Sequence, residues 1–230
     1  IPVHHMEAHL LMAKYDAPQL KYPFLTLLVS GGHTILAKVE SSGVYKILGQ
    51  TIDDAVGEAF DKTAKLLGLR YPGGPEIEKN AAKGEKMKES FPRPILKSED
   101  YNFSFSGLKT AVLYKVNSLK KKNEFTKQTI SDVSLEFQEA AIDCLLYKTK
   151  KALIDFNLNQ VVLSGGVAAN KQLRKRFNEE LGKKYTVIYP DFSHCTDNGA
   201  MIAFSGFEKF SSCDKENNIS VNPRWSLEEI

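Results

Sequence analysis

The sequence has few cysteines, and their arrangement excludes two classes of protein. Only Cys144, Cys195 and Cys213 occur among 230 residues, and no CxxC pair is present. An odd number of scattered cysteines argues against a disulfide framework and against a zinc cage built from thiolates. We therefore expect a protein of the reducing cytoplasm.

Long apolar runs and a strong charge of either sign are also missing. No stretch approaches the roughly eighteen apolar residues that span a bilayer, and no signal-peptide pattern opens the chain. Lys and Arg number 31 against 28 Asp and Glu, a net charge of +3 that permits a nucleic-acid partner without requiring one. With 42% hydrophobic residues, the chain can bury a core, so we expect a soluble α/β protein with no membrane contact.

The spacing of apolar residues predicts strands that alternate with helices. Short apolar segments predict an antiparallel meander over residues 24–30, 34–40 and 45–50. Helices are expected after Asp53 or Asp54 as N-cap, at Pro75, and over 131–156; residues 103–106 are expected to form a strand, and the lysine-rich stretch 120–127 a loop. From Gln160 the pattern is strand, helix, strand, helix. This order is the one expected of a ribonuclease-H-like unit.

Two glycine pairs stand where an apolar strand ends. Gly31-Gly32 follows LLVS, and Gly165-Gly166 follows VVLS. Backbone amides at such positions can approach an anion without interference from side chains. The basic helix expected after Asn170 offers a further anion site at its N-terminus. The segments match neither a P-loop nor a Rossmann fingerprint, so a nucleotide would bind by another motif.

Histidines crowd the start of the chain in HHMEAH. His5 and His9 are four residues apart, which places them on one face of a short amphipathic helix, within reach of a common metal ion. Glu7 follows His5 by two residues rather than one and points away, which disfavours the HExxH mechanism of zinc proteases. From spacing alone, His5 and His9 could also be ordinary packed histidines that bind no metal. If they do bind one, the candidates for a third ligand are Asp197, with His194 or Cys195 nearby, and His33.

Six blocks of the sequence together resemble a known family. HHMEAH, LLVSGGHT, GEAFDKTAKLLGLRYPGGP, FSFSGLKT, VVLSGGVAAN and CTDNGAMIA, in this order, are similar to the TsaD/Gcp family of bacterial tRNA threonylcarbamoyladenosine transferases, formerly called O-sialoglycoprotein endopeptidases. The resemblance implies an actin-like ATPase (ASKHA) fold. It also implies transfer of a threonylcarbamoyl group from threonylcarbamoyl-adenylate to the adenine amino group of the adenosine next to the anticodon in tRNA.

The resemblance also implies roles for particular residues. His5, His9 and Asp197 match the metal ligands of the family, with Fe²⁺ expected rather than Zn²⁺, and Asp61 or Asp197 is the candidate catalytic carboxylate. The segment from FSFSGLKT is expected as pocket wall, through Ser106, Gly107 and Lys109. The expected substrate-binding residues are Leu28, Val29, Ser30, Gly31, Gly32, Asp61, Gly74, Glu78 and Asn170.

The family pattern has a further N-terminal segment, with a first phosphate loop, that this sequence does not contain. The resemblance therefore implies an N-terminally truncated chain. Residues 1–22 would be a remnant of the first lobe with the metal helix, 23–196 the second lobe, and 197–230 a helix and tail returning to the first lobe. We expect an exposed apolar surface where the first lobe would pack, and little activity from the fragment alone.

Partners and rival functions follow from the same resemblance. TsaB-like and TsaE-like proteins, tRNA and the ATP-derived adenylate are the expected partners and substrates. The alternatives are a metal-dependent glycoprotein endopeptidase, a non-catalytic nucleotide-binding partner subunit, and a sugar kinase or actin-like ATPase. A peptidase would need a glutamate that faces the metal ion, whereas a partner subunit would not need His5, His9 and Asp197.

Overall fold

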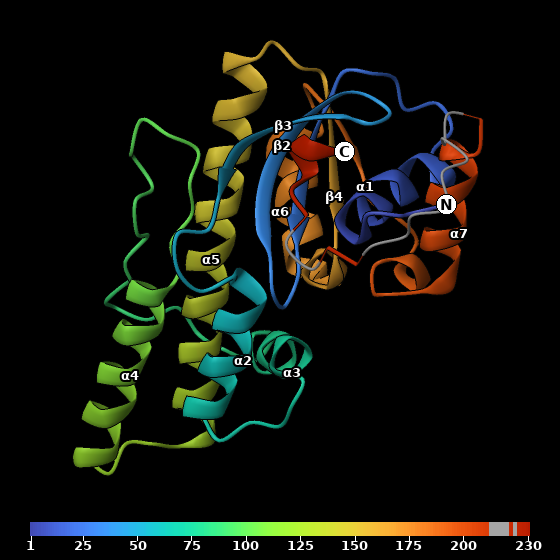
Figure 1. Ribbon diagram of the computed structural model, residues 1–230. Helices are drawn as coiled ribbons and strands as arrows, with labels where there is room; N and C mark the ends of the chain where they lie inside the picture. Colours follow the sequence, from blue (N-terminus) through green and yellow to red (C-terminus); the bar gives the residue numbers. More distant parts are fainter. Residues whose placement is uncertain (212–220, 223–224) are drawn as a thin grey trace.

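A five-stranded sheet forms the centre of the computed structural model, which describes residues 1–211, 221–222 and 225–230. The strand order is β3-β2-β1-β4-β5 (Figure 1). The first three strands pair antiparallel, whereas β1 pairs with β4, and β4 with β5, in parallel. This confirms the meander and the order of a ribonuclease-H-like unit. The strands are β1 (Phe24–Val29), β2 (Thr34–Ser41), β3 (Val44–Gln50), β4 (Gln160–Ser164) and β5 (Thr186–Ile188).

Seven α-helices of the described residues cover this sheet and extend beyond it. They are α1 (His5–Asp16), α2 (Val56–Leu66), α3 (Gly73–Ala81), α4 (Ser106–Lys121), α5 (Lys127–Asp155), α6 (Lys171–Leu181) and α7 (Gly199–Lys209). The central strand β1 is buried on both faces. Leu25, Leu27 and Val29 pack into the core shared with α2, α4, α5 and α6, whereas Phe24 and Leu28 face the core shared with α1. Alternate residues of one strand therefore join two separate cores.

Helix α1 is buried on all sides along its middle and exposed only near its ends, at His5 and Tyr15, so it is not amphipathic as the sequence suggested. Every residue from Met6 to Ala13 is buried. Leu10 belongs to the core against the sheet, whereas Ala8 and Met12 pack against Met201 of α7. The middle of a helix that lies between a sheet and another helix is covered on both sides, so its apolar residues no longer mark a single stripe.

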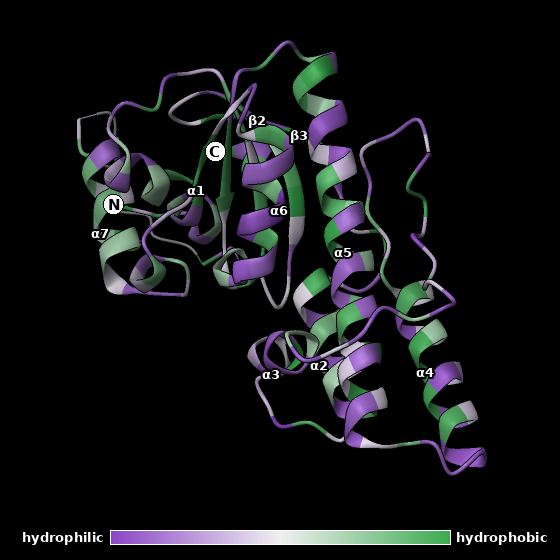
Figure 2. Ribbon diagram, turned by 180° about the vertical axis from the view of Figure 1, so that it is seen from behind, coloured by the Kyte–Doolittle hydropathy of each residue, from purple (hydrophilic) through white to green (hydrophobic). Residues whose placement is uncertain are grey.

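Helices α2, α3 and α4 gather around the part of α5 that extends past the sheet (Figure 1). Helix α5 runs over 29 residues and begins with a capping box at Thr126. In Figure 2, apolar residues line the sheet, and α4 and α5 carry hydrophilic turns between their apolar ones. The predicted lysine-rich loop is confined to residues 122–126, because α4 continues to Lys121 and α5 begins at Lys127.

Two local predictions around Asp53 were wrong. Residues 103–106 contribute only one isolated bridge, Thr51 to Phe103, and Ser106 already begins α4. Asp53 does not cap α2; its carboxylate accepts hydrogen bonds from the Ser104 hydroxyl and the Phe105 amide at the start of α4. The amide of Val56, at the start of α2, donates instead to the Thr34 hydroxyl.

The outer side of α7 exposes apolar side chains. Phe207 and Phe210 are each 74% exposed, and Ile202 is partly exposed. That the first lobe packs on this surface stays a prediction. The lobe boundaries after residues 22 and 196 stay predictions.

Candidate functional site

Three predicted metal ligands meet where α1 faces the N-terminus of α7. The Nε2 atoms of His5 and His9 lie 3.5 and 3.0 Å from Oδ1 of Asp197. One ligand atom from each residue lies within 4.8 Å of the others. Asn198 caps α7 by accepting the Met201 amide; this cap fixes the backbone beside Asp197.

The chemistry of this donor set suits a transition-metal ion. Two imidazoles and one carboxylate on one side of an ion, with open positions opposite, are the ligands of non-haem iron and of catalytic zinc. His9 is buried and His5 is exposed, so the cluster is reachable from solvent on one side. Burial lowers the pKa of His9 below its ordinary value, despite the hydrogen bond to Asp197, and this favours the neutral imidazole that a metal needs.

The other candidate third ligands lie elsewhere or beside the cluster. His194 pairs with Asp16 through Nδ1, at 3.0 Å. Cys195 is buried, and its sulfur accepts from Arg174. His33 lies beside the cluster, since it and His5 line one cavity of about 700 Å³.

The two remaining polar residues of HHMEAH point away from the cluster. Glu7 is fully buried, accepts a hydrogen bond from Tyr45 and lies 2.6 Å from Nζ of Lys209. The ring of His4 caps α1 and is hydrogen-bonded to the Trp225 carbonyl at 2.6 Å. As the order of residues predicted, no carboxylate of the helix faces His5 and His9 as a base.

The two glycine pairs lie side by side at the carboxyl ends of β1 and β4. Leu28 pairs with Ser164, so the segments that follow leave the sheet together. Gly165 has a φ of +87°, and a side chain there would collide with the Val29 carbonyl, so this close approach requires glycine. Gly31 and Gly32 are exposed and have open space around them. A β-carbon added at Gly166 would lie 3.9 Å from Cγ2 of Thr196. Thr196 directly precedes Asp197, so the second loop lies near the histidine cluster.

The other predicted substrate residues lie within α2 and α3 and at the start of α6. The Asp61 carboxylate accepts the Gly73 amide at 2.7 Å and fixes the turn before Gly74. Glu78 accepts the Lys171 amide at 2.6 Å. Asn170 caps α6 and donates to Gln138. These side chains therefore accept hydrogen bonds from amides at the N-termini of α3 and α6, the positive ends of the two helix dipoles.

Sequence motifs assigned no role in the site to Gly57, Asp54 or Gln138, which support it. Gly57 of α2 donates its amide to the Ser30 carbonyl at 3.2 Å, so the helix rests directly on the first glycine loop. Its signal was a glycine inside a helix, where alanine is ordinarily favoured. Asp54 forms ion pairs with both Lys62 and Lys109. The side chain of Lys109, which was expected in the pocket wall, is therefore directed at Asp54. Buried Gln138, the partner of Asn170, gave no signal in the sequence.

No helix in the described part of the chain is long and apolar enough to cross a membrane. This agrees with the missing apolar runs in the sequence.

Comparison with known proteins gives concordant results. Residues 1–204 match the family model described as TsaD, tRNA N6-adenosine threonylcarbamoyltransferase. Proteins of that name from Chromobacterium violaceum and Methylobacillus flagellatus are 47% and 49% identical to the chain over 232 residues. Each match covers the whole chain and 68% of the relative.

Solved structures agree in fold. Full-length HypF in its phosphate- and nucleotide-bound form superposes with a TM-score of 0.66 at 17% identity, over 90% of this chain and 43% of that one. Component A of (R)-2-hydroxyglutaryl-CoA dehydratase from Acidaminococcus fermentans gives 0.55 at 16% identity, over 90% of this chain and 69% of its own. These neighbours belong to the actin-like ATPase fold class, which confirms the predicted fold.

Proposed function

This chain belongs to the tRNA N6-adenosine threonylcarbamoyltransferase family, and from that premise we propose that it carries the transfer site of such an enzyme. The reaction moves a threonylcarbamoyl group from threonylcarbamoyl-adenylate to the adenine amino group of the adenosine next to the anticodon in tRNA. The chain spans about two thirds of the length of its relatives, so the activity is proposed for the full-length protein.

The observation that carries the proposal is the junction of the histidine cluster and the glycine loops. A β-carbon added at Gly166 would lie 3.9 Å from Cγ2 of Thr196, the residue before Asp197, and His33, which follows Gly31-Gly32, lines the same cavity as His5. An anion held by the loops is therefore next to the cluster. That is the arrangement that a mixed anhydride of a carbamate and a phosphate needs.

The chain's own residues supply position and charge for this reaction. The amides of Gly31, Gly32 and Gly166 can donate to phosphate oxygens, which offsets the charge that develops on departing adenosine monophosphate. His5, His9 and Asp197 would hold one divalent ion, which as a Lewis acid polarises a carbonyl oxygen. Because the anhydride is already activated, holding it in a reactive orientation supplies much of the remaining rate.

The two proposed catalytic carboxylates are placed differently. Asp61 is committed to the Gly73 amide, which makes it a residue that shapes the adenylate site. Asp197 is exposed beside His9 and can accept a proton as well as bind an ion. Between the two, we assign the role next to the reacting groups to Asp197.

Cofactor, partners and compartment complete the proposal. Two histidines and one carboxylate can hold either Fe²⁺ or Zn²⁺. Of these two ions we propose Fe²⁺, as the resemblance to the family implies. TsaB-like and TsaE-like proteins are the proposed partners, tRNA and threonylcarbamoyl-adenylate the substrates, and the cytoplasm the compartment.

The position of Glu7 argues against a peptidase, and the histidine cluster argues against a non-catalytic subunit. A metallopeptidase needs a glutamate beside the ion, but Glu7 is buried and held by Tyr45 and Lys209. A non-catalytic subunit does not explain why His5, His9 and Asp197 converge. The six sequence blocks are also not those of a kinase or ATPase.

A transfer assay tests the proposal directly. Unmodified tRNA is incubated with the full-length protein, its partners and threonylcarbamoyl-adenylate, and its nucleosides are analysed by mass spectrometry. We expect threonylcarbamoyladenosine to form. A protein that leaves the tRNA unmodified but cleaves a glycoprotein would refute the proposal in favour of the peptidase.

A further inference from the structure

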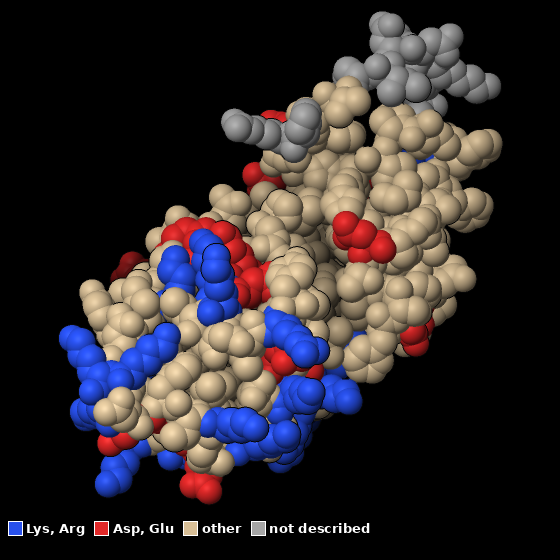
Figure 3. Space-filling view, turned by 90° about the horizontal axis from the view of Figure 1, so that it is seen from below, with Lys and Arg blue, Asp and Glu red and all other residues tan. Residues whose placement is uncertain are grey.

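Positive charge is concentrated in one part of this nearly neutral chain. Residues 62–127 hold 15 Lys and Arg against 7 Asp and Glu, a net charge of +8, whereas the whole chain has +3. Figure 3, seen from below, shows these side chains gathered over the end of the molecule that α2, α3 and α4 form, with few at the opposite end. The helical end is therefore a basic surface on an otherwise acidic chain.

A groove between α2 and α4 lies within this basic surface. It has a volume of about 460 Å³. Leu66 and Leu113 contribute its apolar floor. Its remaining lining residues are four lysines and one threonine: Lys62, Lys65, Lys109, Lys120 and Thr110. Lys109, Leu113 and Lys120 lie on one face of α4, and the two lysines are about 16 Å apart along its axis.

The charges of the groove are only half compensated. Lys62 pairs with Asp54 and Glu58, and Lys109 also pairs with Asp54. Lys65 and Lys120 are exposed, and neither makes an ion pair with a carboxylate of the described residues. Lys120 instead lies over the ring of Phe125, 5.0 Å from its centre. Two ammonium groups therefore carry the surplus charge of the groove.

Helix α2 connects the groove to the proposed adenylate site. Asp61, which holds the Gly73 amide, directly precedes Lys62 in the chain. At its N-terminus the same helix rests on Ser30 of the first glycine loop through Gly57. A long anion in the groove would thus lead towards the reacting groups rather than away from them.

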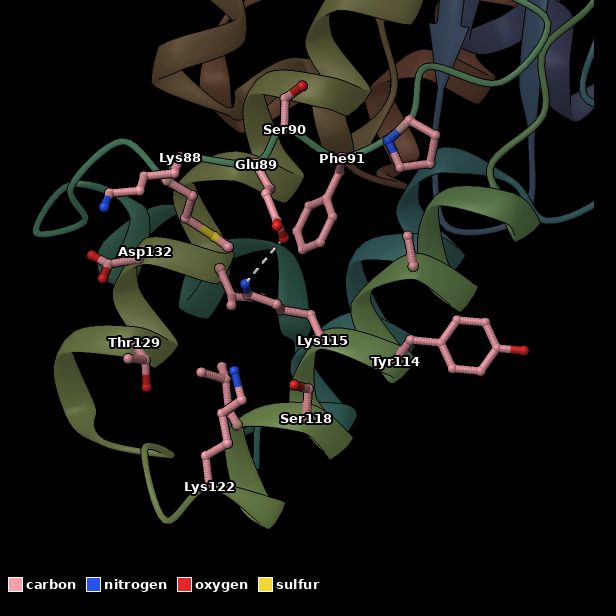
Figure 4. Close-up of a pocket in the computed structure, with 15 residues that line it drawn as sticks. Lys88, Glu89, Ser90, Phe91, Tyr114, Lys115, Ser118, Lys122, Thr129 and Asp132 are labelled. Carbon is pink, nitrogen blue, oxygen red and sulfur yellow. Dashed lines mark ion pairs between the residues drawn. The ribbon is translucent and has the colours of Figure 1, made fainter.

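A second cavity on the other side of α4 differs in its charge. It measures about 780 Å³ and is lined by residues of α4, α5 and the segment 87–92. Figure 4 shows Lys115 of α4 directed at Glu89, with 3.7 Å between Nζ and Oε2, and Asp132 on α5. Because carboxylates line this cavity and none lines the α2–α4 groove, an anionic partner favours the groove.

We propose that the α2–α4 groove binds the sugar-phosphate backbone of the tRNA substrate, with Lys65 and Lys120 as its principal phosphate contacts. The inference rests on the proposed function, which makes RNA the polyanion that must reach this site. A backbone carries one charge every few ångströms, so several phosphates fit along the lysine face of α4. Such contacts orient the RNA and are indifferent to its base sequence.

The test compares two pairs of neutralised lysines in the full-length protein with its partners. The groove variant is Lys65→Gln with Lys120→Gln. The control is Lys150→Gln with Lys175→Gln, two exposed lysines on α5 and α6 outside the groove, with the same change in net charge. Affinity for unmodified tRNA is measured by fluorescence anisotropy across a salt series, beside circular dichroism and binding of the adenylate.

We expect the groove variant alone to bind tRNA about tenfold to a hundredfold more weakly at 0.1 M salt, with a salt slope lower by about 1.8 for two lost contacts. Folding and adenylate binding should not change. Equal affinity in both variants, or loss of partner-protein assembly in place of tRNA binding, would overturn the groove assignment. Absence of transfer by the unaltered protein would contradict the proposed function itself.

Discussion

Substitution of Gly57 by alanine should displace the first glycine loop, because Gly57 of α2 lies directly against Ser30 and Gly31. A β-carbon at this position would lie 2.5 Å from the Ser30 carbonyl oxygen and 2.9 Å from the Gly31 α-carbon. Ordinary contacts begin near 3.4 Å, so the first glycine loop or α2 has to move by roughly 1 Å. The amide of Gly57, which donates to Ser30, would be displaced with it.

The magnitude follows from two opposing terms. Alanine in place of glycine within a helix ordinarily stabilises by about 0.5–1 kcal/mol, whereas overpacking costs about 1–3 kcal/mol. We expect a net loss of about 1–2 kcal/mol. A loop misplaced by 1 Å lowers the transfer rate by about a hundredfold, so activity should fall far more than stability.

Denaturant unfolding and single-turnover transfer measure these two effects. Gly206→Ala in α7 is the matched control, because its β-carbon would lie 3.7 Å from Val3, an ordinary contact, and we expect it to stabilise slightly. Transfer by Gly57→Ala at the rate of the unaltered protein would refute the claim that α2 positions the Ser30-Gly31 loop.

Three further substitutions test the buried polar groups. Glu7→Gln removes the charge of a buried carboxylate that accepts a hydrogen bond from Tyr45 and pairs with Lys209, so we expect a loss of about 1–3 kcal/mol in chemical unfolding. Transfer per folded molecule should persist, and a specific loss of transfer would place Glu7 in the reaction. Asn170→Ala removes the cap of α6, so we expect a loss of about 1–2 kcal/mol and weaker adenylate binding by calorimetry; unchanged values for both would contradict its assigned position. Burial lowers the pKa of Lys148 below 10.5, so the folded state releases its proton before the unfolded state does. The stability of the unaltered protein relative to Lys148→Met should therefore rise as pH approaches 10.5, and a difference that falls with pH would contradict this sign.

The sequence predicted the sheet because strand patterns there are unambiguous. Residues 24–29 are apolar except for Thr26, lie between Pro23 and the Ser30-Gly31 turn, and form a strand buried on both faces. Residues 103–106 alternate apolar and polar side chains, which is also typical of a strand, but the Asp53 carboxylate accepts the amide of Phe105, where α4 starts. A contact between residues 52 positions apart is not visible in a local pattern.

The site was predicted from the resemblance rather than from spacing. Spacing alone left Asp197, His33, His194 and Cys195 as equal candidates to join His5 and His9. The packing of α7 against α1 brings Asp197 to the two histidines. His194 pairs instead with the carboxylate of Asp16. Which distant segments pack together depends on the whole core, so local chemistry could not select the third ligand.

Nucleoside mass spectrometry of tRNA from cells that depend on this protein tests the account most directly. Cells receive the full-length protein either unaltered, as His9→Ala, as Asp197→Ala, or as His194→Gln, a control outside the cluster. We expect threonylcarbamoyladenosine with the unaltered protein and the control, and none with the other two, whose purified forms should also lose bound metal. Normal levels of the modified nucleoside with either His9→Ala or Asp197→Ala would contradict the assignment of this cluster as the centre of the transfer site.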